Sequence, residues 1–100
     1  MEEKEFKRLY QGDWVDHRPI LIVAGRQTEF IHYMETLAKD AKAVVRKGGE
    51  WELDGQPYYF VNRMEQMRGI RAKDVQFIGT FYELRNVSDM EIYAKVCTQY

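Results

Sequence analysis

The fold follows from one stretch of the sequence, Pro19-Ile20-Leu21-Ile22-Val23-Ala24-Gly25-Arg26-Gln27-Thr28. Residues 20–24 form an unbroken apolar run, which is typical of a β-strand that is covered on both faces. Gly25 ends the run, and Pro19 keeps the residue before it out of the helical region. The stretch therefore predicts a buried strand that stops at a glycine and leads into a helix.

The segment after Gly25 changes from the period of a strand to that of a helix. Its apolar side chains recur on one side, while the polar side chains fall on the other. The apolar set comprises Phe30, Ile31, Met34, Leu37, Ala38 and Ala41. Thr28 is the predicted N-cap of this helix. Residues 43–45 predict a second strand, so the three elements form a βαβ unit, which is nearly always right-handed.

A β-hairpin is predicted next. Asp54-Gly55 stands between two short apolar segments, at residues 51–53 and 58–61, and Asp-Gly in that setting is a strong hairpin signal. Alternation along the first arm places Glu50 and Glu52 on one face. Two carboxylates on one face suit acid–base catalysis, but they also suit a solvated edge strand, which is the commoner case.

Several further elements complete the predicted fold. Asn62 and Glu65 are three residues apart, which is the spacing of a capping box. This pair predicts a helix of about two turns. Residues 74–79 predict a strand, with Phe81 as its furthest limit. Ser88 is the predicted cap of a last helix, and residues 2–10 predict a short amphipathic helix before the first strand.

These elements together predict one α/β domain. It covers residues 1–100, with an N-terminal helix and loop at 1–18 and a core at 19–97. A chain of this length suits one compact core. The predicted architecture is a small, mostly parallel sheet of about four or five strands, with helices on its faces and a β-hairpin insertion.

The bulk composition excludes several classes of function. A net charge of −1 gives no overall field for nucleic acid or an anionic membrane, so such binding needs a local patch. The longest apolar run is far shorter than a membrane span, and the acidic start of the chain is unlike a signal peptide. We therefore expect a cytoplasmic protein without a membrane partner.

Residues suited to nucleophilic or metal chemistry are few and scattered. Cys97 is the sole cysteine, and neither His17 nor His32 stands at metal-ligand spacing from it. Ser88 is the sole serine and is accounted for as a helix cap. The sequence therefore predicts no catalytic residue, no metal and no cofactor, and it favours a protein that is not an enzyme.

A ligand site is predicted at one edge of the sheet. In open α/β sheets, ligands bind beyond the carboxyl ends of parallel strands, where helix N-termini present N–H groups. The side chains that follow the predicted strands would meet there and donate hydrogen bonds to a phosphate or a nucleic-acid backbone. The predicted ligand-binding residues are Arg26, Gln27, Thr28, Asn62, Arg63 and Thr80. The alternative is that glycines and arginines end strands routinely, without a ligand.

A second feature is a basic patch just after three aromatic residues. Its members are Arg63, Arg68, Arg71 and Lys73, and Tyr58, Tyr59 and Phe60 precede them. Basic residues near aromatic ones are typical of surfaces that bind single-stranded nucleic acid. Cations at the C-terminal end of a helix, where they complement the helix dipole, are the alternative account.

Two stretches resemble parts of a known family. Ile20-Leu21-Ile22-Val23-Ala24-Gly25-Arg26-Gln27-Thr28 resembles the strand and loop that enter the phosphate site of terminase- and helicase-type P-loop NTPases. Met67-Arg68-Gly69-Ile70-Arg71-Ala72-Lys73-Asp74-Val75-Gln76-Phe77-Ile78 resembles the approach to their second, acidic motif. The combination, over residues 20–96, is similar to small uncharacterised phage-type proteins with a P-loop-like or Rossmann-like core.

The departures from that family matter as much as the matches. Glu29 and Phe30 stand where the P-loop has glycine and lysine, and a carboxylate there repels phosphate. Gly79-Thr80 stands where the second motif needs an acidic residue that holds magnesium. The resemblance therefore implies a degenerate P-loop-like core that has lost its hydrolytic residues.

Three hypotheses about function follow. The first is a small non-enzymatic α/β binding protein, phage-encoded and in the host cytoplasm, that binds a phosphate-bearing ligand, nucleic acid or a host or phage protein partner. The second is a nucleotide-binding accessory protein or enzyme with a diverged phosphate loop. The third is an oligomerising protein-interaction module, including a homo-oligomer, whose contact residues are Trp14, Trp51, Tyr82 and Tyr100. The ligand site depends on the strands at Ile20 and Val75 lying side by side and parallel.

Overall fold

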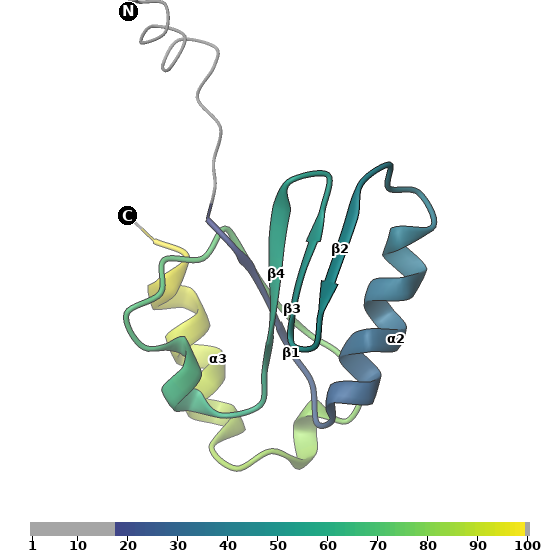
Figure 1. Ribbon diagram of the computed structural model, residues 1–100. Coiled ribbons are helices and arrows are strands. Elements are labelled where there is room, and N and C mark those ends of the chain that lie inside the picture. The colour runs from purple at the N-terminus through teal and green to yellow at the C-terminus, as the bar shows by residue number, and fades with distance from the viewer. Residues whose placement is uncertain (1–17, 100) are drawn as a thin grey trace, which may run out of the picture.

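The computed structural model describes residues 18–99. Its elements in chain order are β1 (Ile20–Val23), α2 (Gln27–Ala38), β2 (Val44–Lys47), β3 (Glu50–Leu53), β4 (Gln56–Val61), the 3₁₀ turn η1 (Met64–Met67), β5 (Asp74–Phe77), the 3₁₀ turn η2 (Phe81–Glu83) and α3 (Val87–Cys97) (Figure 1). The helix predicted at residues 2–10, and the predicted contact residues Trp14 and Tyr100, lie outside the described residues.

The strands form one mixed five-stranded sheet in the order β2-β3-β4-β1-β5. β1 is parallel to both β4 and β5, while β3 is antiparallel to both β2 and β4. An α/β domain is therefore confirmed, but the sheet is mixed, because two of its four strand pairs are antiparallel. The chain turns tightly at Gly48 and at Asp54-Gly55, all with positive φ, so β2, β3 and β4 form a meander. The strand, helix and strand of the predicted βαβ unit are present, and β3 and β4 lie between β1 and β2 in the sheet.

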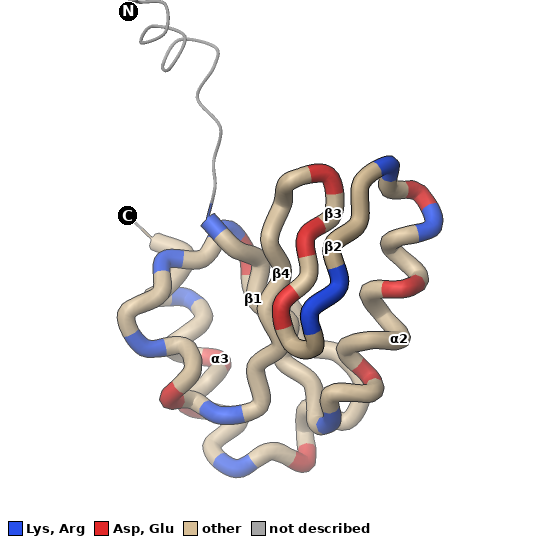
Figure 2. Tube along the Cα trace, in the orientation of Figure 1, with Lys and Arg blue, Asp and Glu red and all other residues tan. Residues whose placement is uncertain are grey.

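The helices cover the two faces of the sheet (Figure 1). α2 packs with Phe30 and Met34 against Ile22 on one face, and α3 and η1 pack against Leu21 and Val23 on the other. All five of these side chains are fully buried. β1 is thus covered on both faces, as its continuous apolar sequence predicts. Figure 2 shows that the charged residues of the meander stand in rows, the basic ones on β2 and the acidic ones on β3.

The helix starts differ from the predicted caps. α2 follows an extended Arg26, and the side chain that accepts hydrogen bonds from the turn is that of Glu29, not Thr28. A carboxylate is the stronger acceptor because it is charged and has two oxygens. α3 begins one residue before Ser88, so this serine is inside the helix and is not its cap.

The segments after β4 and β5 are shorter than predicted. η1 is a single 3₁₀ turn, and its box is shifted by one residue, because Gln66 accepts the N–H groups of Asn62 and Arg63. β5 stops before Gly79, whose φ of 57° redirects the chain into η2. Phe81 therefore begins a turn and does not extend the strand.

Candidate functional site

The carboxyl ends of β1, β4 and β5 meet at one edge of the sheet. Val23 is in register with Val61 on β4 and with Phe77 on β5. The pairing continues beyond the strands, since the Ala24 N–H donates to the Val61 carbonyl at 3.1 Å and the Ile78 N–H to the Val23 carbonyl at 2.9 Å. The side-by-side parallel arrangement on which the predicted ligand site depends is therefore confirmed.

The side of this edge between β1 and β5 is filled by the carboxylate of Glu29. Its Oε1 accepts the N–H groups of Gly25 and Arg26 at 3.1 and 3.2 Å. Its Oε2 accepts the N–H and the hydroxyl of Thr80 at 3.2 and 2.9 Å. One side chain thus joins the turn after β1 to the turn after β5, and the two turns are in close contact.

The ionisation of Glu29 follows from these contacts. Partial burial raises the pKa of its carboxyl group, but the hydrogen bonds from Thr80, Arg26 and Gly25 outweigh that effect and leave the pKa below its usual range. The group is therefore an anion at neutral pH. The backbone donors that a phosphate would use at the start of α2 already bind an anion of the chain itself.

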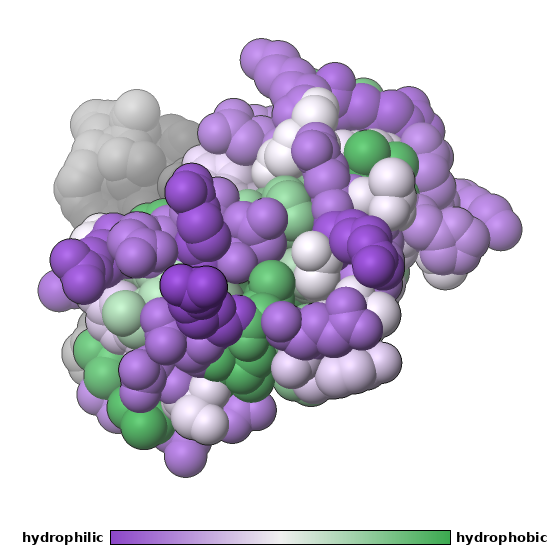
Figure 3. Space-filling view, turned by 90° about the horizontal axis from the view of Figure 1, so that it is seen from below, coloured by the Kyte–Doolittle hydropathy of each residue, from purple (hydrophilic) through white to green (hydrophobic). Residues whose placement is uncertain are grey.

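The side between β1 and β4 is open. β1 leads into α2 on one face of the sheet, while β4 leads into η1 on the other, so the chain diverges at this point. In α/β sheets such a divergence between parallel neighbours is where ligands bind. A groove of about 610 Å³ lies here; we call it the β1/β4 groove, and its lining residues are Gln27, Lys47, Gly49, Glu50, Tyr59, Phe60, Val61, Asn62, Gln66 and Ile70. Figure 3 views this end of the molecule, where hydrophilic residues dominate and hydrophobic ones surface near the centre.

The polar side chains of the β1/β4 groove have almost no protein partners. Within residues 18–99, no hydrogen bond or ion pair involves the side chains of Gln27, Lys47, Glu50, Tyr59 and Asn62. Lys47 and Glu50 are directly opposite in the β2–β3 ladder, yet they form no ion pair. The side chain of Gln66 uses its carbonyl oxygen on the turn, and its amide nitrogen stays free to donate.

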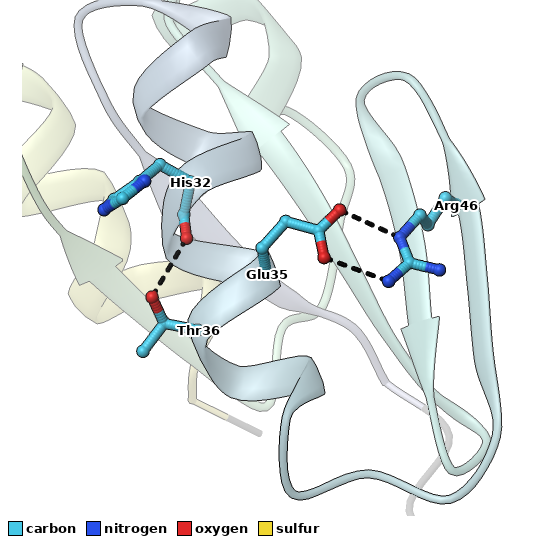
Figure 4. A network of polar contacts seen from close by, with 4 residues as sticks. All are labelled: His32, Glu35, Thr36 and Arg46. Atoms are coloured by element: carbon cyan, nitrogen blue, oxygen red, sulfur yellow. Dashed lines mark hydrogen bonds and ion pairs between the residues drawn. The ribbon is translucent and has the colours of Figure 1, made fainter.

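Lys47 faces the groove, because Arg46, its neighbour on β2, faces α2 on the opposite side of the sheet. The Arg46 guanidinium donates two hydrogen bonds of 2.9 Å to Glu35 on α2 (Figure 4). Arg46 also stacks 5.1 Å from the ring centre of Trp51. Successive strand residues point to opposite faces, so Lys47 points away from α2. Trp51 is only 3% exposed, which removes it from the predicted contact surface of an oligomer.

The six predicted ligand-binding residues separate into two groups. Gln27 and Asn62 line the β1/β4 groove, and Arg26 and Arg63 are exposed next to them in the chain. The other two belong to the filled side: Thr80 donates to Glu29. Thr28 lines a separate groove of about 400 Å³ beside Glu29, with His32, Tyr33, Thr36, Ile78 and Gly79.

The predicted basic patch is spread along the molecule. β4 and β5 are parallel, so the segment between them runs from the carboxyl end of the sheet back to its amino end (Figure 2). Arg63 lies at the first end, and Lys73, whose N–H donates to the Pro19 carbonyl, lies at the other. Arg68 and Arg71 stand between them in the chain. These four cations therefore form a line and not a compact cluster.

The sequence signals for the other groove residues were present but incomplete. Lys47 follows a predicted strand, and Glu50 was assigned by alternation to one face with Glu52; both glutamates are exposed, away from the buried face of β3. The sequence groups Tyr59 with the aromatic residues before the basic patch. Gln66 is not among the predicted residues, because the predicted capping box, Asn62 with Glu65, lies one residue before the box in the structure.

No metal or membrane feature is visible in residues 18–99. No group of three or more His, Cys, Asp or Glu side chains in this range is arranged to hold a metal ion. None of the helices in this range is both long and apolar enough to cross a membrane. Cys97 is buried, and burial raises the pKa of its thiol. Comparisons with family models, curated proteins and solved structures find no match.

Proposed function

We propose that this chain is a small non-enzymatic binding protein that holds a phosphate-bearing ligand in the β1/β4 groove. The observation that carries the proposal is the convergence of polar side chains from several elements, without protein partners, where β1 and β4 diverge. Binding sites typically combine a preformed cavity with a few such polar groups.

The groove residues indicate the chemistry of the ligand. Lys47 and Glu50 are the charged residues of the lining, and the exposed Arg26 and Arg63 are next in the chain to the lining residues Gln27 and Asn62. The amides of Gln27 and Asn62 can each donate and accept hydrogen bonds. This set favours a ligand with one anionic group and several neutral polar groups, and the nearby tyrosine ring offers a surface for stacking.

The filled side of the edge supports the same location. A phosphate between β1 and β5 would have to displace the Glu29 carboxylate from its four hydrogen-bond donors, against repulsion between like charges. A degenerate P-loop-like core of phage origin remains part of the proposal. The support for the P-loop-like core is the parallel arrangement of β1, β4 and β5 and the glycine turn that leads into α2.

Calorimetric titration tests the proposal with matched pairs of ligands. Nucleoside 5′-monophosphates are compared with the same nucleosides without phosphate, and with inorganic phosphate. Lys47→Met is expected to weaken binding of the phosphorylated ligands at least about tenfold, through loss of a charge-assisted hydrogen bond. Lys42→Met is the matched control, because this exposed lysine is not in the groove. Equal binding with and without phosphate, or no binding by the whole set, would refute the proposal.

A second candidate function is binding of single-stranded nucleic acid along the line of cations. The observation that favours it is that Arg63, Arg68 and Arg71 are exposed and make no ion pair within residues 18–99. Binding would then weaken steeply with salt. It would be lost in the double variant Arg63→Ala plus Arg68→Ala and retained in Lys47→Met, which separates it from the groove proposal.

A further inference from the structure

Helix α3 presents an exposed apolar stripe to solvent. Ile92 and Val96 are 63% and 54% exposed, among the most exposed large apolar side chains of the described residues. They are four residues apart, so they lie one above the other on the same side of the helix. The opposite side of α3 is fixed in the core by Met90 and Cys97, which are buried. The stripe therefore has no partner within residues 18–99.

A groove extends this apolar surface. It has a volume of about 480 Å³ and runs from α3 to the segment that follows η1. Val96 belongs to both the stripe and the groove, so the two form one continuous surface. The remaining lining residues are Met67, Gly69, Ile70, Arg71, Tyr93, Cys97 and Gln99.

Two of the three charged residues of α3 flank Ile92 symmetrically, while the third, Glu91, has no charged counterpart across Ile92. Asp89 lies three residues before Ile92 and Lys95 three residues after it, and both are exposed. Neither side chain makes a hydrogen bond or an ion pair within residues 18–99. If two such helices pack antiparallel with Ile92 at the centre, each Asp89 faces a lysine and each Lys95 faces an aspartate. The helix dipoles are also opposed in that arrangement.

We propose that α3 is a self-association surface on which a second copy of this chain packs. Ile92 lies at the two-fold axis, and Asp89 pairs with the partner's Lys95, twice by symmetry. This is an isologous contact, in which one patch is complementary to itself. No residue of α3 lines the β1/β4 groove, so the contact does not depend on the proposed ligand.

Sedimentation velocity of the full chain over a range of concentrations tests the contact. The mass is expected to rise toward twice the 12.0 kDa of one chain. Ile92→Glu is expected to raise the dissociation constant at least about tenfold, because it places charge at the centre of the interface. Val45→Glu is the matched control, since this residue is also exposed, at 41%, but lies on β2.

A charge exchange tests the antiparallel geometry. Asp89→Lys and Lys95→Glu should each weaken self-association, because each places like charges opposite one another. A mixture of the two single variants should associate again, since every facing pair then has opposite charges. Circular dichroism checks that each variant folds. A chain that stays monomeric, or a dimer that Ile92→Glu and the exchange leave unchanged, would overturn the proposal.

Discussion

The turns after β1 and β4 are built on the same plan but have opposite consequences. Each has an arginine in extended conformation, with φ and ψ of −138° and 149° at Arg26 and of −143° and 146° at Arg63. Three residues later, Glu29 or Gln66 accepts two backbone N–H groups through one oxygen. The two turns differ in what else the Glu29 or Gln66 side chain contacts.

The further contacts of this side chain differ between the closed and the open side of the edge. Both oxygens of Glu29 accept hydrogen bonds from the N–H and the hydroxyl of Thr80, and these bonds close the β1/β5 side. The amide nitrogen of Gln66 makes no hydrogen bond within residues 18–99, and Gln66 lines the β1/β4 groove. The closed side thus has a carboxylate bound on both oxygens, and the open side has an amide with an unused donor.

The largest expected effect comes from forcing the closed side apart. In Gly25→Ala, the new Cβ would lie 2.2 Å from the Thr80 hydroxyl oxygen and 2.7 Å from its carbonyl oxygen. We expect the free energy of unfolding to fall by about 2–3 kcal/mol, measured by urea denaturation. Gly49→Ala is the control, because its Cβ would make only an ordinary contact of 3.6 Å with Phe60. Equal losses in the two variants would contradict close contact between the turns.

Removal of the Glu29 carboxylate should have the next largest effect. Glu29→Ala leaves two backbone N–H groups and Thr80 without their acceptor, and we expect the melting temperature to fall by about 5–10 °C. Inorganic phosphate should then stabilise the variant more than it stabilises the parent chain, because these donors are free only in the variant. A variant that phosphate does not stabilise would show that these donors do not form an anion site by themselves.

Conversion of the open turn into a copy of the closed one should affect binding more than stability. Gln66→Glu keeps the acceptor for Asn62 and Arg63, so the free energy of unfolding should change by no more than about 0.5 kcal/mol. The added carboxylate should weaken a phosphate-bearing ligand of the groove about tenfold or more, measured by calorimetry. Gln66→Leu, which removes the acceptor without adding charge, should instead cost stability.

The smallest expected effect is on the pH dependence of stability. The pKa of Glu29 is lower in the folded chain than in the unfolded one, so the unfolded state binds more protons on acidification. The contribution of this group is therefore complete above the pKa of an unfolded glutamate and is lost as the pH falls through its folded pKa. Urea denaturation from about pH 7 to pH 3 should show a shallower acid loss for Glu29→Gln than for the parent. Arg46 lowers the pKa of Glu35, so protonation of Glu35 lowers the free energy of unfolding at acidic pH in both proteins.

Much of the fold could be predicted because its signals are local. The continuous apolar run of β1 predicts burial on both faces, and its residues from Leu21 to Val23 are fully buried. Asp54-Gly55 predicts a hairpin because few sequences accept two positive φ angles in succession, and the hairpin is there. The alternation of β3 follows from the strand period of two, with Trp51 buried and Glu52 exposed.

The candidate site could be predicted only in part, because some of its contacts join residues that are far apart in the sequence. That Gln27 and Asn62 line the same groove follows from strand direction, which the sequence suggests. That Glu29 reaches Thr80 depends on a contact between residues 51 apart, and no local pattern encodes it. Local sequence specifies the strands, the hairpin and the two α-helices, since periodicity and turn chemistry act over a few residues. The strand order depends on contacts between distant residues and is visible in the fold alone, and with it which side of the edge a carboxylate closes and which side is open.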